Sequence, residues 1–288
     1  MYNRRTLNLK LHNITLDRTL HINPDSPFRL LEQDKMFATD YEIMTQENAE
    51  RDGVIISNTK FSARYIPLLL EFRNHRGAVE FREELIHCFS PAHECVLYVQ
   101  RNNINRRINC RVSRVGGDPE YLDDPYMLNF ELLCPDPHFK DTDDTTVKFL
   151  QYEPLMSFPL IFVPVAGMTT GIISASDGLK VNNIGDMNIG VIITIKAAGG
   201  IVKNPKILCN DKYIQLSTTL NTNDVAEIST METGKYIKIN GIKSRFFNRQ
   251  SRFFDLKRGI NYIKIEAEDN TVTNSEIAVT YTNKWFGV

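Results

Sequence analysis

Hydrophobic and polar residues alternate with a period of two through much of the chain. Leu7, Leu9 and Leu11 alternate with polar residues, which is typical of a strand with one buried face. Further strands of this kind are predicted at Val54–Ile56, Tyr65–Phe72, Cys95–Val99, Ile108–Val115 and Met127–Cys134. Because these runs are rich in β-branched and aromatic residues and are separated by turn clusters, they predict an antiparallel sheet.

One segment of the first half follows a different period. Between Gly77 and Phe89, the apolar residues Ala78, Phe81 and Leu85 recur at spacings of three and four, with glutamates between them. This spacing predicts an amphipathic helix of about three turns. Pro91 prevents the helix from continuing, so we expect it to end before that residue.

The character of the chain changes around residues 135 to 157, where prolines and acidic residues gather. The second half reads as strands punctuated by turn signals, among them the runs Pro159–Val165, Gly190–Ile195, Tyr236–Ile239 and Tyr262–Ala267. We therefore predict a mainly β protein of two domains, since 288 residues exceed the usual size of a single core. The domains are a β-rich N-terminal domain with one α-helix (residues 1–145) and a C-terminal β-sandwich (residues 146–288).

Charge and cysteine content exclude several classes of partner. Lys plus Arg total 34 and Asp plus Glu total 35, so the net charge of −1 gives no reason to expect nucleic acid or a membrane as a partner. The basic N-terminus is followed by no apolar stretch, which predicts no signal peptide. The five cysteines are scattered, which predicts free thiols in a protein made in a reducing cytoplasm.

Candidate catalytic and metal-binding residues are few. The chain has no GxSxG, GxGxxG, P-loop or HExxH motif. His87, Cys88, His93 and Cys95 carry donors that suit zinc, but His87 and Cys88 point in different directions on the helix and Cys88 belongs to its apolar face. We predict no catalytic residue, no metal and no cofactor, and a protein that is not an enzyme.

Three stretches carry a family resemblance. The run LNFELLCPDPHFKD begins at Leu128, VNNIGD spans 181–186 and LKRGINYIK spans 256–264. Together with the order of the helix and strands before them, they resemble the siphophage distal tail protein (Dit) family. The resemblance implies a galectin-like C-terminal sandwich and a homo-hexameric ring that joins the tail tube to the tail-tip or baseplate proteins, with a channel through which DNA passes. It implies a location at the tail tip of a virion or of a tail-like bacteriocin particle, with synthesis in the bacterial host cytoplasm.

Charge is distributed unevenly along the first domain. Five arginines occur without an acid between residues 101 and 114, and an acidic stretch follows. Either two neighbouring strands have complementary faces, or one subunit's basic face meets the next subunit's acidic face in a ring. In the second case, the candidate oligomer interface comprises Arg101, Arg106, Arg107, Arg111, Arg114, Asp118, Glu120, Asp123 and Asp124. We assign the shaping of the domain junction to Pro135, Asp136, Pro137 and Phe139, because prolines end strands.

A basic segment in the second domain is a candidate partner contact. Residues 243–258 hold six basic residues against one acid, and the tetrapeptide SRFF occurs twice there. The candidate contact residues are Phe246, Phe247, Phe253 and Phe254, although core packing is the more common role of such phenylalanines. The alternative to a ring component is a carbohydrate-binding adhesion module for host cell-wall polysaccharide, with the glycan bound by the second domain.

Overall fold

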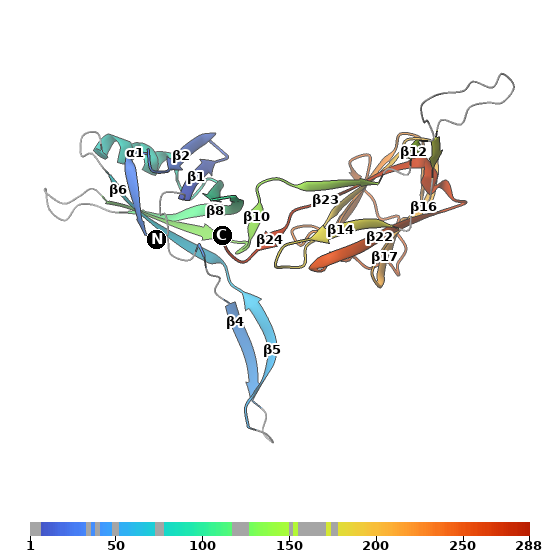
Figure 1. The fold of residues 1–288 in the computed structure, drawn as a ribbon, viewed down its shortest axis with the longest axis horizontal. Coiled ribbons are helices and arrows are strands. Elements are labelled where there is room, and N and C mark those ends of the chain that lie inside the picture. Colours follow the sequence, from blue (N-terminus) through green and yellow to red (C-terminus); the bar gives the residue numbers. More distant parts are fainter. Residues whose placement is uncertain are drawn as a thin grey trace. The chain divides into compact units, whose positions relative to one another are not determined.

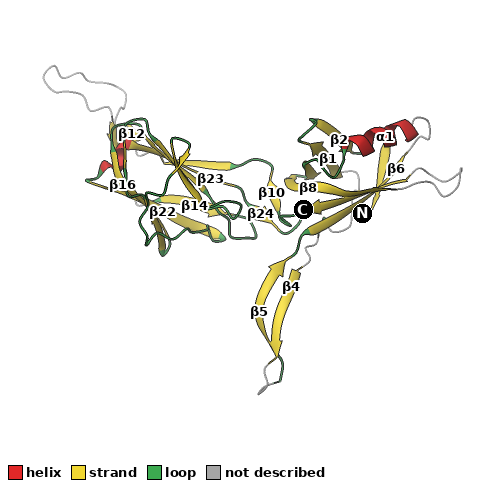
Figure 2. Cartoon of the chain, turned by 180° about the vertical axis from the view of Figure 1, so that it is seen from behind, coloured by secondary structure: helices red, strands yellow, loops and turns green. Residues whose placement is uncertain are grey.

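The computed structural model describes residues 7–32, 36–37, 41–47, 52–72, 78–116, 127–149, 152–154, 171–173 and 178–288. The chain forms two units: unit 1 comprises Met1–Thr142 and Lys284–Val288, and unit 2 comprises Asp143–Asn283. Strands dominate both units, and one α-helix occurs among the described residues (Figures 1 and 2). The last five residues, which the sequence analysis assigned to the second domain, belong to unit 1 because they pair with a strand of that unit.

Unit 1 is built on one strongly bent antiparallel sheet. Its elements are β1 (Leu7–Asn13), β2 (Arg18–Ile22), β3 (Phe28–Glu32), β4 (Tyr41–Glu47), β5 (Val54–Phe61), β6 (Arg64–Phe72), α1 (Ala78–Cys88), β7 (Cys95–Arg101), β8 (Ile104–Gly116), β9 (Met127–Cys134), β10 (Phe139–Asp141) and β24 (Lys284–Trp285). The strand order is β2-β1-β7-β8-β9-β6-β3, with β10 between β8 and β24. Strands β4 and β5 form a separate two-stranded sheet.

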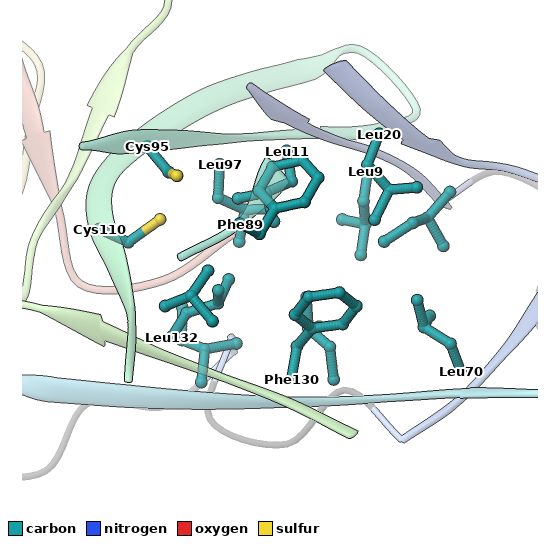
Figure 3. Packing of buried hydrophobic residues seen from close by; sticks show 14 of the residues in the cluster. Leu9, Leu11, Leu20, Leu70, Phe89, Cys95, Leu97, Cys110, Phe130 and Leu132 are labelled. Carbon is teal, nitrogen blue, oxygen red and sulfur yellow. The ribbon is translucent and has the colours of Figure 1, made fainter. Parts of the chain in front are cut away.

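The bend lies in β8. Its first half, Ile104–Cys110, pairs with β7, whereas its second half, Arg111–Gly116, pairs with β9 with a register shift between Val112 and Arg114. A bulge of this kind bends a strand and increases its twist. The two halves of the sheet therefore face each other. Figure 3 shows leucines from both halves, together with Phe130 of β9 and Phe89 after α1, meeting between them.

Helix α1 closes this core at one side. Leu85 and Phe89 are buried, and the Phe89 ring lies edge-on to Phe130 with 6.1 Å between ring centroids. The helix ends at Cys88, as the proline at position 91 predicts, while Phe89 still donates its N–H to the carbonyl of Leu85. The amphipathic spacing thus predicted the helix and the burial of Leu85, whereas the side chains of Ala78 and Phe81 lie outside what the structure describes.

Unit 2 is a sandwich of two antiparallel sheets. Its strands are β11 (Thr145–Phe149), β12 (Tyr152–Pro154), β13 (Gly171–Ile173), β14 (Leu179–Asn183), β15 (Ile192–Ala197), β16 (Val202–Cys209), β17 (Lys212–Gln215), β18 (Thr219–Leu220), β19 (Val225–Ser229), β20 (Tyr236–Ile239), β21 (Ile242–Lys243), β22 (Gly259–Glu268) and β23 (Ser275–Tyr281), with the 3₁₀ helix η2 at Thr271–Asn274. One sheet has the order β11-β23-β15-β19-β20-β21. The other has the order β14-β22-β16-β17, with β18 beside β16. The predicted strand Pro159–Val165 lies outside the described residues.

The core of unit 2 lies between these sheets. Strand β22 shows the pattern: Asn261, Ile263 and Ile265 point inward, while Ile260 and Tyr262 are exposed. This alternation is what the sequence predicts for a strand with one buried face. No helix in the described part of the chain is long and apolar enough to cross a bilayer.

Candidate assembly surfaces

Strands β4 and β5 form an arm that extends from the rest of unit 1 (Figure 1). Every described residue of the two strands is exposed except Phe61, which is half-buried. A two-stranded hairpin is marginally stable in water, and neither of its edges pairs with another strand that the structure describes. The arm therefore has the features of a segment that packs against something outside this chain.

The two faces of the arm differ in polarity. Residues directly opposite each other share a face, and the register pairs Tyr41 with Phe61, Thr45 with Ile56 and Glu47 with Val54. One face, which we call the apolar face of the arm, carries the apolar residues Tyr41, Ile43, Val54, Ile56 and Phe61 together with Thr45, Glu47 and Thr59. The opposite face carries Glu42, Gln46, Asn58 and Lys60, with Met44 and Ile55 as its apolar members.

The base of the arm is fixed within unit 1. Arg64 donates hydrogen bonds to the carbonyl oxygens of Met36 (Nη1–O 3.4 Å) and Phe286. The Phe61 ring stacks on Phe286 with 5.4 Å between centroids and lies edge-on to His138 at 5.0 Å. Phe286 thus holds the chain at the point where β5 of the arm continues into β6.

The C-terminal segment itself is held by arginine and tryptophan. In β24, Trp285 lies opposite Phe139 of β10. Its indole N–H donates to Asp141 (2.7 Å), and the Arg106 guanidinium lies 4.1 Å from the ring centroid. Arg106 also donates to the carbonyl of Gly287. Trp285 and Arg106 therefore both fasten the last residues to the sheet.

Asp136, one of the predicted junction residues, is the centre of a charged cluster in unit 1. Its carboxylate oxygens lie 3.0 Å from His138 Nδ1, 3.1 Å from Lys140 Nζ and 3.4 Å from Lys284 Nζ. Burial alone would raise the pKa of Asp136, but the hydrogen bond from His138 and the charges of the two lysines hold it well below its usual range. Nothing in the sequence pattern indicated that this residue lies at the centre of a cluster of ion pairs.

The other predicted junction residues have ordinary structural surroundings. Phe139 belongs to the core of unit 1, and the Arg64 guanidinium lies 5.0 Å from its ring centroid. Pro137 is buried, and Pro135 is exposed just after β9 ends at Cys134. A role of these residues in shaping a junction stays a prediction.

The five arginines of the candidate interface are not equivalent. Arg106, Arg107 and Arg101 are half-buried: Arg107 Nε donates to the carbonyl of Asp141 at 3.2 Å, and Arg101 lies over the Phe37 ring. Arg111 and Arg114 are exposed, and Arg111 forms an ion pair with Glu94 at 2.8 Å. Hence Arg111 and Arg114 are the members of this set that remain accessible for a contact with another subunit.

The acidic half of that candidate interface cannot be placed. Asp118, Glu120, Asp123 and Asp124 lie outside the described residues. Whether they face the arginines of a neighbouring subunit therefore stays a prediction.

Two of the four residues considered as zinc ligands, His93 and Cys95, have other structural surroundings. The Asn13 side chain donates to the carbonyl of Cys88 at the end of α1, and His93 Nδ1 lies 3.3 Å from that oxygen and 3.1 Å from Asn13 Nδ2. Cys95 is buried, and burial raises its pKa to about 11. In the described part of the chain no group of His, Cys, Asp or Glu is arranged to hold a metal ion.

The sequence analysis missed the arm and its base. Strand β4 was not predicted, although the dipeptide Asp52-Gly53 just before Val54 is a hairpin signal and Gly53 has φ +101°. The roles of Arg64, Trp285 and Phe286 have no local signal, because their partners lie far away in the sequence.

The fold and these surfaces define a class of protein. Residues 184–285, nearly all in unit 2, match the family model described as siphovirus-type tail component, C-terminal domain. This region is thus similar to the C-terminal domain of siphovirus-type tail components. No curated protein sequence matches the chain.

Solved structures extend the likeness to the whole chain. The Dit protein (gp 19.1) of phage SPP1, described as a paradigm of the hub adsorption apparatus in phages that infect Gram-positive bacteria, is 13% identical with a TM-score of 0.66. The alignment covers 96% of this chain and 98% of that protein. A chain of the phage P2 baseplate in its activated conformation with Ca is 10% identical with a TM-score of 0.52, over 98% of this chain and 99% of that one. The resemblance to distal tail proteins and the predicted mainly β fold class, a β-rich N-terminal domain with one helix followed by a galectin-like sandwich, are thereby confirmed.

Proposed function

We propose that this chain is a structural subunit of a siphophage-type tail tip that closes into a ring with copies of itself, using the arm of unit 1. A hexamer is the stoichiometry that the family resemblance implies. The ring would join the tail tube to the tip or baseplate proteins and leave a channel for DNA. The observation that supports this proposal is the apolar face of the arm, which nothing in the described chain covers.

Exposure makes this face unusual for a chain that works alone. Ile56 is 63% exposed, Tyr41 58%, Val54 56% and Ile43 50%. Exposed apolar side chains that gather on one face of a monomer often mark an interaction site. Because the opposite face of the arm is mainly polar, burial on a single partner surface suits the pattern.

A second copy of the chain is the occupant that the geometry favours. The arm and the sheet of unit 1 are two different surfaces of the same molecule, and contacts between different surfaces generate rings when the rotation closes. The fixed base at Arg64 and Phe61 reduces the freedom that the arm loses on binding.

The experiment is to measure the mass of the full-length protein by light scattering after size exclusion. We expect a mass of about 200 kDa, six times the 33.1 kDa of one chain. Ile56→Lys places a charge on the apolar face and should yield monomer, because an unpaired charge would be buried in the contact. Ile55→Lys is the matched control: Ile55 is the adjacent residue, 56% exposed, on the opposite face, and this variant should keep the wild-type mass.

Two results would contradict the proposed assembly. A wild-type protein that stays monomeric at every concentration would remove the support for self-assembly through the arm. Equal dissociation by both lysine variants would show that the apolar face has no special part.

The remaining expectations follow from the family resemblance. We expect no enzymatic activity, since the matched family is a structural tail component. Location at the tail tip and synthesis in the host cytoplasm are part of the same proposal. Glycan binding by unit 2 stays the alternative prediction.

A further inference from the structure

The two SRFF tetrapeptides of unit 2 have opposite surroundings. In the second, Phe254 is 2% exposed within the core and Phe253 packs against that core. In the first, Phe246 is 67% exposed and Phe247 is 37% exposed. Core packing therefore explains the second pair. The backbone of the first pair is bonded to Ser217 and bridged to Leu216, but its side chains take no part in the core.

Residues 242–252, which we name the basic loop, are held in place by backbone hydrogen bonds to both sheets of the sandwich. Ser244 N–H donates to Ile237 of one sheet at 2.8 Å. Asn248 N–H donates to Gln215 at 2.9 Å, and Arg252 N–H donates to Tyr213 at 2.8 Å, both on β17 of the other sheet. The exposure of Phe246 is therefore a property of a fixed loop.

Side chains add to this anchoring. Gln215 N–H donates to Ser251 Oγ at 3.0 Å, and Asn248 Nδ2 donates to Gln215 Oε1 at 3.2 Å. Tyr213 donates its hydroxyl to Gln250 Oε1 at 3.1 Å. A surface loop with this many bonds presents its apolar side chains in a fixed arrangement, which lowers the entropy that a binding partner must overcome.

The apolar residues of the basic loop are flanked by uncompensated positive charge. Ile242 is 75% exposed, which makes it and Phe246 the two most exposed large hydrophobic residues that the structure describes. The exposed cations of the loop are Lys243, Arg245, Arg249 and Arg252. The loop contains no acid, and within the described residues none of these four cations forms an ion pair.

We propose that the basic loop is a docking surface for an acidic protein surface that offers an apolar pocket to Phe246. The inference rests on the proposed function only in placing that partner among the tail-tip proteins. Aromatic and arginine side chains are the types enriched where protein interfaces carry most of their binding energy. Charge complementarity at the rim would steer the encounter and set the orientation.

A protein partner fits this loop better than a glycan. Phe246 and Ile242 have no hydrogen-bonding side-chain atoms, so they recognise an apolar pocket and give no directional contact to sugar hydroxyls. Anionic polymers could still be attracted by the four cations. The test therefore includes such a polymer.

The probe is a random peptide library selected against the full-length protein, followed by affinity measurement by fluorescence polarisation. We expect the selected peptides to combine acidic residues with at least one aromatic or aliphatic residue. Phe246→Ala should weaken their binding roughly tenfold, the loss typical of an important interface aromatic. The double variant Arg245→Glu, Arg249→Glu should weaken it at least as much, and the wild-type affinity should fall with added salt.

The matched control is Tyr262→Ala, on β22 of the same unit and 60% exposed, which should leave peptide affinity unchanged. Selected peptides without an acidic excess, or binding that survives Phe246→Ala, would overturn the proposal. Tighter binding of poly(glycerol phosphate) than of any selected peptide, with competition between the two, would also overturn it and assign the loop to a cell-wall polymer. Because Phe246→Ala should not change the mass of the assembled protein, failure here is distinguishable from failure of the ring.

Discussion

Replacing Asp136 by asparagine tests whether the charged cluster of unit 1 stabilises the fold. The substitution keeps the shape of the side chain but removes the negative charge that His138, Lys140 and Lys284 approach to within 3.4 Å. It would leave two lysine ammonium groups close together with no carboxylate between them. The C-terminal segment would then also lose its attachment through the ion pair of Lys284 with Asp136.

The magnitude follows from burial and the number of contacts. Hydrogen bonds to a charged group contribute about 1.5–3 kcal/mol each when well formed. The Asp136 side chain is 28% exposed, so water screens part of each contact, and the substituted amide would still accept one hydrogen bond. We expect a loss of about 2 kcal/mol in the free energy of unfolding, equivalent to roughly a 30-fold change in the folding equilibrium.

The pH dependence has a defined sign. Since the pKa of Asp136 is lowered in the folded protein, its contribution is fully present above the unfolded value of about 4 and is lost as the pH falls through the folded value. The difference between wild type and Asp136→Asn should therefore be constant at pH 5 and above, and should shrink as the pH is lowered below about 4.

The assay is urea unfolding followed by the fluorescence of Trp285. This is the only tryptophan in the chain and it lies in unit 1, so the signal reports on that unit. Asp224→Asn is the control, because Asp224 is a half-buried carboxylate of unit 2 whose pKa is also lowered, by hydrogen bonds from Asn240 and Asn221. An unchanged midpoint in Asp136→Asn, or a difference that does not shrink at low pH, would refute the reasoning.

Two further predictions concern the cores. Phe254→Ala should lower the stability of unit 2 by about 3–5 kcal/mol, the usual cost of a large cavity, whereas Phe246→Ala should change it by less than about 0.5 kcal/mol; thermal unfolding followed by circular dichroism compares them. Ellman's reagent at pH 8 should react with at most Cys88 of the five cysteines in the native protein and with all five in urea. The reason is that Cys95, Cys110, Cys134 and Cys209 are buried, and burial raises the pKa of Cys209 to about 11. Rapid reaction of several thiols in the native state would contradict this burial.

The periodicity of apolar residues predicted those elements that depend on the local pattern alone and not on distant partners. The strand Met127–Cys134 and the helix ending before Pro91 are correct because alternation and spacing report which face is buried. The run Val54–Ile56 shows the limit of this reasoning. Its three apolar residues predicted a strand, but nothing local indicates that the strand belongs to an exposed arm.

The arginines show a second limit. The charge split between residues 101 and 144 left open either complementary strands within the chain or a contact between subunits, and Arg106 is used within unit 1 on Trp285 and Gly287. Its partners are about 180 residues away in the sequence, and composition carries no information on such pairs. Residues such as Arg111 and Arg114, which pair locally or face solvent, are the ones for which the charge argument still applies.

Pairing β10 of unit 1 with β24 at the end of the chain costs conformational entropy, because the two strands are far apart in the sequence. Phe139 of β10 pairs with Trp285 of β24, and joining two such distant points in a flexible chain is costly. Unit 2 reduces this cost, because β11 and β23 pair and place Thr145 opposite Tyr281. Once unit 2 has folded, the chain leaving β10 and the chain entering β24 emerge from adjacent strands, so the effective loop is only a few residues long. The same argument applies to Arg64 and Arg106, which donate to the carbonyl groups of Phe286 and Gly287: in a chain whose unit 2 is folded, closing these contacts also costs little entropy.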